Sequence, residues 1–210
     1  MGKNCFLILA NGPWPKISQI KSISSGALHV IACDGALERT LKHGIQVNTV
    51  IGDMDSASEE SLVMFSEQGG TIIENTDKDS NDLAKAIAFC AELGQNQLIV
   101  IGALGGDIAH EWANILTCLA SDIEVELIGE NTRIKTLLAD KYYSIEVGSG
   151  KEFSLFAIPF CNRIRLTGCK FELMDEDLAM GSRGVHNIAL NKCIEISFAK
   201  GALIIINSLD

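Results

Sequence analysis

The stretch TVIGDMDS, from Thr49 to Ser56, joins a strand-like run to an acidic turn. Its first three residues are β-branched and favour a buried strand, which the glycine would end. Asp53 and Asp55 follow, with one residue between them. Carboxylates at positions i and i+2 of a turn can point at one hard cation, and an oxygen-only set suits Mg²⁺ better than Zn²⁺. The stretch therefore predicts a strand with a magnesium site at its end.

A second acidic loop, TDKDSND (76–82), comes directly before a helical pattern. Asp, Asn and Ser also form turns and cap helices, so capping explains either loop alone about as well as function does. Both loops follow short strand-like runs, and open α/β sheets bind ligands at the carboxyl ends of their strands. This placement favours a metal–phosphate site. Asp34 ends an earlier strand-like run, where it could cap the next helix or contact a ligand.

Strand-like runs alternate with helical patterns over the first two thirds of the chain. The runs begin at Cys5, Leu28, Thr49, Thr71, Gln97 and Ile123, and the helical patterns cover 18–25, 36–43, 59–68, 82–93 and 109–119. In the pattern 82–93 the apolar positions 83, 86, 87, 90 and 93 lie on one helical face. The alternation predicts a mostly parallel, doubly wound α/β/α domain.

The pattern changes near Arg133, after which only strand-like runs follow. They are RIKTLLA, YYSIEV, EFSLFAI, RIRLTG, CIEISF and ALIIIN, separated by Gly, Asp, Asn or Pro. Without a convincing helix among them, they predict an all-β domain of sandwich or barrel type. We place the boundary after Leu138, which gives domains 1–138 and 139–210.

The formal net charge of −10 is concentrated in the first domain. There are 18 acidic and 9 basic residues before Ala139, and 9 acidic and 8 basic residues from there on. This sign argues against a nucleic-acid partner, and an acidic site that handles phosphates needs a divalent cation. No apolar run is long enough to span a bilayer, so no membrane partner is expected. The seven cysteines form no CxxC pair and lie mostly in apolar runs, which indicates reduced residues of a cytoplasmic protein.

The segment GALGGD (102–107) forms a third loop of interest. It follows a strand and precedes a helix, but its spacing differs from the dinucleotide fingerprint and it is no P-loop. Its glycines would still let backbone N–H groups approach a phosphate at the helix N-terminus. In the loop after the first strand, Trp14 could stack on a ligand, but a role in covering the edge of the core is favoured.

Taken together, these motifs resemble those of the thiamine pyrophosphokinase family, in order and over nearly the whole chain. The matching segments are GDMDS (52–56), DKDSND (77–82), GALGGDIAH (102–110) with Asn114 four residues after its histidine, LTGCKFEL (166–173) and GSRGVHN (181–187). The family combines an α/β catalytic domain with a β-sandwich domain. The resemblance implies transfer of pyrophosphate from ATP to the thiamine hydroxyl with release of AMP, dependence on Mg²⁺, and a homodimer that binds thiamine near the subunit interface.

The resemblance also implies roles for individual residues. The catalytic residues would be Asp53, Asp55 and Asp82. The same three would bind Mg²⁺, with Asp79 as a further or replacement ligand. The ATP contacts would be Asp34, Ser56, Asp77, Lys78, Gly105, Gly106, His110 and Asn114. The thiamine contacts would be Ser182, His186 and Asn187, although the loop that carries them could also be an ordinary hairpin.

The chain departs from the family pattern at four positions of the matching segments. Asn81 replaces a usual Thr, Asp107 a usual Arg, Ala109 a usual Asp, and His186 a usual Ser. Asp107 could weaken ATP binding by repulsion, join the metal shell, or only cap the following helix. Two interpretations therefore stay open: a pyrophosphokinase for thiamine or a related alcohol, and a non-catalytic nucleotide- or thiamine-binding protein. A hydride-transfer enzyme is the weakest candidate, because the first strand–helix turn lacks the fingerprint.

Overall fold

The computed structural model of the chain describes residues 5–209. Its internal contacts divide it into two compact units, which meet in sequence between Glu130 and Asn131. The sequence placed the boundary after Leu138 instead. The difference is strand β7 (Thr132–Leu138), which pairs along its length with β13 (Lys200–Ser208) and therefore counts with the second unit.

The first unit contains a six-stranded parallel sheet in the order β4-β3-β2-β1-β5-β6. The strands are β1 (Phe6–Leu9), β2 (His29–Cys33), β3 (Thr49–Gly52), β4 (Thr71–Glu74), β5 (Gln97–Ile101) and β6 (Glu124–Ile128). The order reverses between β1 and β5, and their carboxyl ends are the topological switch point where such sheets bind ligands. The doubly wound domain is confirmed.

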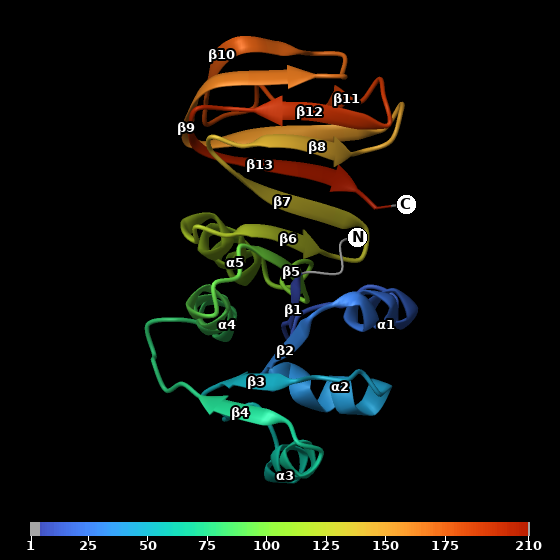
Figure 1. The fold of residues 1–210 in the computed structure, drawn as a ribbon, viewed down its shortest axis with the longest axis vertical. Helices are drawn as coiled ribbons and strands as arrows, with labels where there is room; N and C mark the ends of the chain where they lie inside the picture. Colours follow the sequence, from blue (N-terminus) through green and yellow to red (C-terminus); the bar gives the residue numbers. More distant parts are fainter. Residues whose placement is uncertain (1–4, 210) are drawn as a thin grey trace. The chain divides into compact units, whose positions relative to one another are not determined.

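Helices cover both faces of this sheet (Figure 1). They are α1 (Ile17–Gly26), α2 (Leu37–His43), α3 (Glu59–Glu67), α4 (Asp82–Glu92) and α5 (Ile108–Ala120), with a short 3₁₀ turn η1 (Asp34–Ala36) before α2. On α4 the predicted apolar face is buried at Leu83, Ala86, Ile87 and Cys90. Leu93, the last apolar position of that pattern, is the exposed C-cap. Among residues 5–209, none of the helices has the length and apolar character that a membrane span requires.

The second unit consists of two antiparallel sheets that share one long strand. Its elements are β7, β8 (Tyr142–Glu146), β9 (Glu152–Thr167), β10 (Leu173–Ala179), β11 (Asn187–Ile188), β12 (Cys193–Ser197) and β13. The first half of β9 pairs with β13 and β11, and its second half pairs with β10 and β12. The two runs that the sequence separated at Pro159 are therefore one strand that changes partners.

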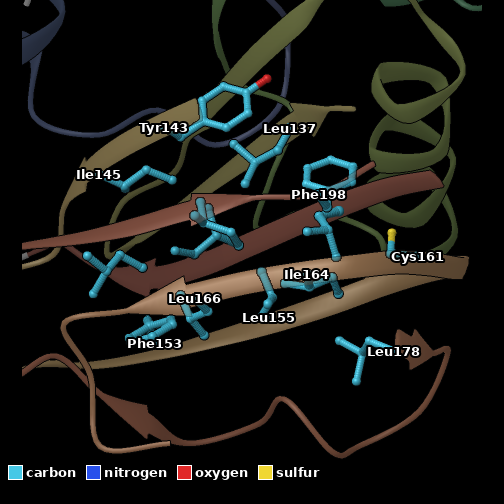
Figure 2. Packing of buried hydrophobic residues seen from close by; sticks show 14 of the residues in the cluster. Leu137, Tyr143, Ile145, Phe153, Leu155, Cys161, Ile164, Leu166, Leu178 and Phe198 are labelled. Atoms are coloured by element: carbon cyan, nitrogen blue, oxygen red, sulfur yellow. The ribbon is translucent and has the colours of Figure 1, made fainter. Parts of the chain in front are cut away.

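Strand β10 was not predicted. Its sequence LMDEDLA carries three acidic residues and buries only Leu178, so it gives little apolar alternation. Residues of both sheets nevertheless form one apolar core, which includes Phe153 and Leu155 from the first half of β9 and Ile164 and Leu166 from the second. Figure 2 shows these side chains gathered between the strands, and Leu178, which belongs to the same core, lies to one side of them. The unit is a β-sandwich, as the resemblance implied.

Candidate functional site

Three carboxylates from two strand ends converge in the first unit. Asp34 follows β2, and Asp53 and Asp55 follow β3. One oxygen of each lies within 4.8 Å of the others. Because β2 and β3 are parallel neighbours, their carboxyl ends meet at the same edge of the sheet. The sequence predicted Asp53 and Asp55 as metal ligands, but it assigned Asp34 to ATP.

The backbone of the GDMDS turn makes this convergence possible. A Cβ atom on Gly52 would lie 2.5 Å from Cγ of Asp34, so only glycine leaves room for the Asp34 carboxylate. Met54 has a φ of 63°, which is uncommon for a residue with a side chain. Because Met54 between the two carboxylates has this conformation, Asp55 N–H can donate to Asp53 Oδ1 at 3.3 Å. Backbone strain of this kind is typical of functional turns.

Asp34 is the buried member of the group, and its pKa is raised. Its side chain is buried, with 1% of the residue exposed. Burial, and then the nearby Asp82 carboxylate, raise its pKa to about 6. Its Oδ1 accepts a hydrogen bond from Gly35 N–H, whereas no donor among residues 5–209 bonds its buried Oδ2. A buried oxygen without a donor, beside two further carboxylates, fits a hard divalent cation such as Mg²⁺.

The second acidic loop and the start of α4 supply carboxylates together with two lysines that pair with carboxylates. Lys78 Nζ lies 3.0 Å from Asp53 Oδ2, and this hydrogen bond lowers the Asp53 pKa to about 2. Asp82 Oδ1 lies 3.1 Å from the buried Nζ of Lys85, one turn further along α4. Among the described residues, Asp79 and Asp82 stay outside the 4.8 Å carboxylate group. Asp82 is nevertheless close enough to Asp34 to raise its pKa.

Asp77 and Asp79 are exposed, and the Asp77 carboxylate bonds within the loop itself. The Asp77 carboxylate accepts hydrogen bonds from Asp79 N–H at 3.0 Å and from the Ser80 hydroxyl. These bonds give the loop its turn and hold the Asp77 pKa below its ordinary value. Turn formation, one of the structural roles predicted for these loops, thus accounts for Asp77 here.

A cavity of about 340 Å³ lies at the switch point, beside the carboxylates. Its walls come from the loops after β1, β2, β3 and β5 and from the starts of α4 and α5. Six of the predicted site residues line it: Asp34, Ser56, Asp82, Gly106, His110 and Asn114. Lining residues that the sequence did not single out include Asn11, Gly12, Pro13 and Glu111. The loop 11–13 carries no charge, and its proximity depends on the strand order, so only the three-dimensional arrangement reveals it.

The glycine-rich loop and the start of α5 are held by acidic side chains of the chain itself. Asp107 is the N-cap of α5, and its Oδ1 accepts hydrogen bonds from the N–H groups of Ala109 at 3.0 Å and His110 at 3.1 Å. Of the alternatives predicted for Asp107, the structure therefore shows the cap of the following helix, α5. Gly105 N–H donates to Glu111 Oε2 at 2.8 Å, so a carboxylate occupies one donor of the predicted phosphate loop.

Two asparagines connect the starts of α4 and α5. Asn81 caps α4 through a 2.9 Å bond from Ala84 N–H, so the replacement of Thr keeps the cap. Its Nδ2 donates to Asn114 Oδ1 at 3.1 Å, and Asn114 Nδ2 donates to the Ala103 carbonyl at 3.0 Å. The Asn114 side chain thus holds the exit of β5, and since Asn114 also lines the cavity, its assignment to ATP stays a prediction.

The predicted thiamine residues lie in the second unit. Asn187 is buried, and its Oδ1 accepts from Phe171 N–H at 3.0 Å while its Nδ2 donates to the Phe171 carbonyl at 2.8 Å. It lines a cavity of about 510 Å³ in this unit. His186 and Ser182 are exposed, and His186 Nδ1 lies 3.3 Å from Glu152 Oε2. In this structure the Asn187 amide thus holds the 169–171 loop.

Comparison with known proteins gives one consistent result. The family model described as "Thiamin pyrophosphokinase, catalytic domain" matches residues 20–127. The thiamine pyrophosphokinase of Bacillus subtilis (strain 168) is 28% identical over 211 residues, which cover 97% of this chain and 98% of that protein.

Solved structures agree on the fold of the whole chain. A thiamine pyrophosphokinase structure from Bacillus subtilis superposes with a TM-score of 0.81 at 23% identity, over 98% of this chain and 99% of the other. One from Candida albicans gives a TM-score of 0.80 at 14% identity, over 99% and 90%.

Proposed function

The chain belongs to the thiamine pyrophosphokinase family, and from this membership we propose that it transfers pyrophosphate from Mg²⁺-bound ATP to the thiamine hydroxyl, releasing AMP. The observation that carries the proposal is the convergence of Asp34, Asp53 and Asp55 beside the switch-point cavity. A protein that only binds a nucleotide has little need to concentrate carboxylates there, because they repel the phosphates unless a cation lies between.

We assign the metal to the converging carboxylates, with Asp82 as the neighbouring acidic residue. Asp79 is the weaker candidate, because it lies outside the carboxylate group and is exposed. When bound, Mg²⁺ would neutralise phosphate charge as it develops, which is the main requirement of phosphoryl-type transfer. Asp53 and Asp55, held by the Met54 turn, would fix its position.

We assign the nucleotide to the cavity between the loops after β1 and β5. In the proposed reaction, the thiamine oxygen forms a bond to the β-phosphorus while the bond from that phosphorus to the α,β-bridging oxygen breaks. The hydroxyl proton leaves to solvent and AMP is the leaving group. The chain contributes mainly orientation: Ser56, Gly106 and His110 line the cavity, and Asn114 fixes the β5 exit.

The acceptor side of the proposal rests on the loop 181–187 and on the homodimer that the resemblance implies. Asn187 would act there by holding the loop 169–171, and the exposed His186 ring would contact the acceptor heterocycle. His186 replaces the usual Ser, so a related alcohol is the nearest alternative acceptor. Equilibrium sedimentation tests the dimer independently of activity.

A non-catalytic nucleotide-binding protein is the second candidate. Two observations favour it: Asp107 replaces a phosphate-binding Arg, and Glu111 already occupies the Gly105 N–H. The deciding experiment is incubation with Mg²⁺, ATP and thiamine, followed by quantification of AMP and thiamine pyrophosphate. Equal amounts of both products support the enzyme. ATP binding without either product, for thiamine and for related alcohols, supports the second candidate.

A further inference from the structure

The side chain of Arg39 on α2 is directed to the loop after β1. Its Nη1 donates to the Gly12 carbonyl at 2.9 Å and its Nη2 to the Asn11 carbonyl at 3.2 Å. Its guanidinium carbon lies 4.3 Å from the centre of the Trp14 ring. No carboxylate of the described residues forms an ion pair with Arg39, so these contacts with the loop are its principal interactions.

The same loop is also tied to the strand across the switch point. Trp14 Nε1 donates to the Ala10 carbonyl at 2.8 Å, and Gly12 N–H donates to the Gly102 carbonyl at 2.8 Å. A Cβ atom on Gly12 would lie 2.4 Å from that Gly102 oxygen, so the two backbones are in close contact. Trp14 itself packs against the core of the first unit, as the sequence favoured.

This loop forms one wall of the cavity. Asn11, Gly12 and Pro13 line it together with Gly106. The Pro13 ring is the nearest neighbour of a Cβ atom built on Gly105 or Gly106, at 3.7 and 3.6 Å. A movement of the loop would therefore change both the width of the cavity and the contact with the glycine-rich segment. Arg39 does not line the cavity, so it can act on a ligand only through the loop.

We propose that Arg39 is a positioning residue that sets nucleotide affinity by holding the Asn11–Pro13 wall, without touching the nucleotide. The proposal rests on the ATP-dependent function proposed above. Arginine is suited to this task because its planar fork binds two carbonyls at once while its face stacks on an aromatic ring. A lysine keeps the charge but provides neither the fork nor the stacking face.

The test compares Arg39→Lys and Arg39→Met with Lys42→Met, an exposed cation on the same helix that serves as the matched control for charge. We expect the KM for ATP to rise about tenfold in Arg39→Lys and up to about a hundredfold in Arg39→Met, since one to two hydrogen bonds and the stacking are lost. The kcat should stay within about threefold, and the KM for thiamine and all constants of Lys42→Met should not change.

A direct binding measurement separates this inference from the proposed reaction. Calorimetry with Mg²⁺ and a non-hydrolysable ATP analogue needs no acceptor. We expect the affinity for the analogue to decrease from wild type to Arg39→Lys and further to Arg39→Met. Absence of analogue binding by the wild type would overturn both the proposed function and this inference. Analogue binding that is equal in wild type and a folded Arg39→Met would overturn the inference alone.

Trp14→Phe provides a second variant that retains an apolar ring but loses the bond to the Ala10 carbonyl. We expect a smaller rise in the KM for ATP, and a double mutant with Arg39→Met that is no worse than Arg39→Met, because both act on one wall. A purely structural role predicts instead a lowered melting temperature with both KM values and kcat affected together, and that result would also overturn the inference.

Discussion

The ammonium of Lys78 lies 3.0 Å from the carboxylate of Asp53, so the two acidic loops are joined by an ion pair at the proposed metal site. Lys78 is exposed, and its pKa is raised by this contact. In the metal-free protein it therefore occupies part of the space and charge that a divalent cation would take. If ATP binds as proposed, we expect the same ammonium to contact its phosphates.

Lys78→Met should separate these two functions. Without nucleotide, Mg²⁺ binding should tighten, because a competing cation is removed. With nucleotide, the KM for ATP should rise severalfold, because one phosphate contact is lost. Mg²⁺ calorimetry and steady-state kinetics measure the two effects, with Lys42→Met as the control. Weaker Mg²⁺ binding in Lys78→Met would contradict the competition.

Asp53→Asn should remove most activity while the protein stays folded. The amide keeps the shape of the side chain but cannot provide an anionic metal ligand, and Asp53 is at the surface of the sheet edge rather than in a core. We expect a loss of 100-fold or more, on the order of 3 kcal/mol in the transition state. Near-normal turnover at an unchanged melting temperature would refute the assignment. Asp79→Asn and Asp82→Asn rank the remaining ligands, and we expect Asp82 to matter more.

Asp34→Asn should abolish activity but stabilise the metal-free protein. Folding raises the Asp34 pKa from 3.8 to about 6, so between these values the folded state holds more protons than the unfolded chain. The contribution of Asp34 to stability should therefore fall as the pH rises from about 4 to about 6. At pH 7 in EDTA the variant should be more stable by roughly 1–3 kcal/mol, and this difference should vanish near pH 4. Melting curves at several pH values check this; a wild type more stable than the variant at pH 7 would contradict it.

Asp107 variants test the helix cap and the phosphate site separately. Asp107→Asn keeps a good N-cap and removes a negative charge, so it should bind ATP more tightly at unchanged stability. Asp107→Arg should bind ATP more tightly still, but it should lose about 1 kcal/mol of stability with the cap. ATP calorimetry at fixed Mg²⁺ and thermal melts measure both. If both variants bind ATP more weakly and need more Mg²⁺, Asp107 is a metal ligand.

Two variants of the 181–187 loop distinguish support from contact. Asn187→Ala should destabilise the protein by roughly 1–3 kcal/mol, because it removes the buried amide that hydrogen-bonds both backbone groups of Phe171. His186→Asn should keep the melting temperature, since Asn tolerates the φ of 58° found there, and raise the KM for thiamine. An unchanged melting temperature in Asn187→Ala, or an unchanged KM in His186→Asn, would contradict the respective role.

The fold of the first unit was predictable because its signals are local. Apolar β-branched runs and helical spacing repeat in alternation, and each predicted helix lies within a few residues of the observed one. The second unit was less predictable at β9 and β10. β9 passes through Pro159 because it exchanges partners there, and β10 is held by pairing with β9 rather than by an apolar face of its own. In both cases the strand is determined by pairing with segments that are distant in the sequence or are not marked by an apolar pattern.

The same distinction applies to the candidate site. The acidic loops were recognisable because their residue types and strand-end positions carry chemistry. The position of Asp34 among the carboxylates was not, because it depends on the pairing of β2 with β3 and on the missing Cβ of Gly52. Sequence patterns also do not reveal the contributions of Arg39 and Glu111. Arg39 binds the Gly12 carbonyl, 27 residues away in sequence, and Glu111 folds back from α5 to accept from Gly105 N–H.

Since the proposed metal and nucleotide site is assembled from the ends of β1, β2, β3 and β5, it exists only once these strands have paired. In the unfolded chain Asp34 is separated from the adjacent pair Asp53 and Asp55, and the cavity does not exist, so the affinity should be much lower. Binding of Mg²⁺ and ATP would therefore stabilise the folded state of the first unit. At a free ligand concentration 100 times Kd, this linkage adds about 2.7 kcal/mol to the free energy of unfolding. In a cell, the amount of intact protein would then follow the supply of its own substrate.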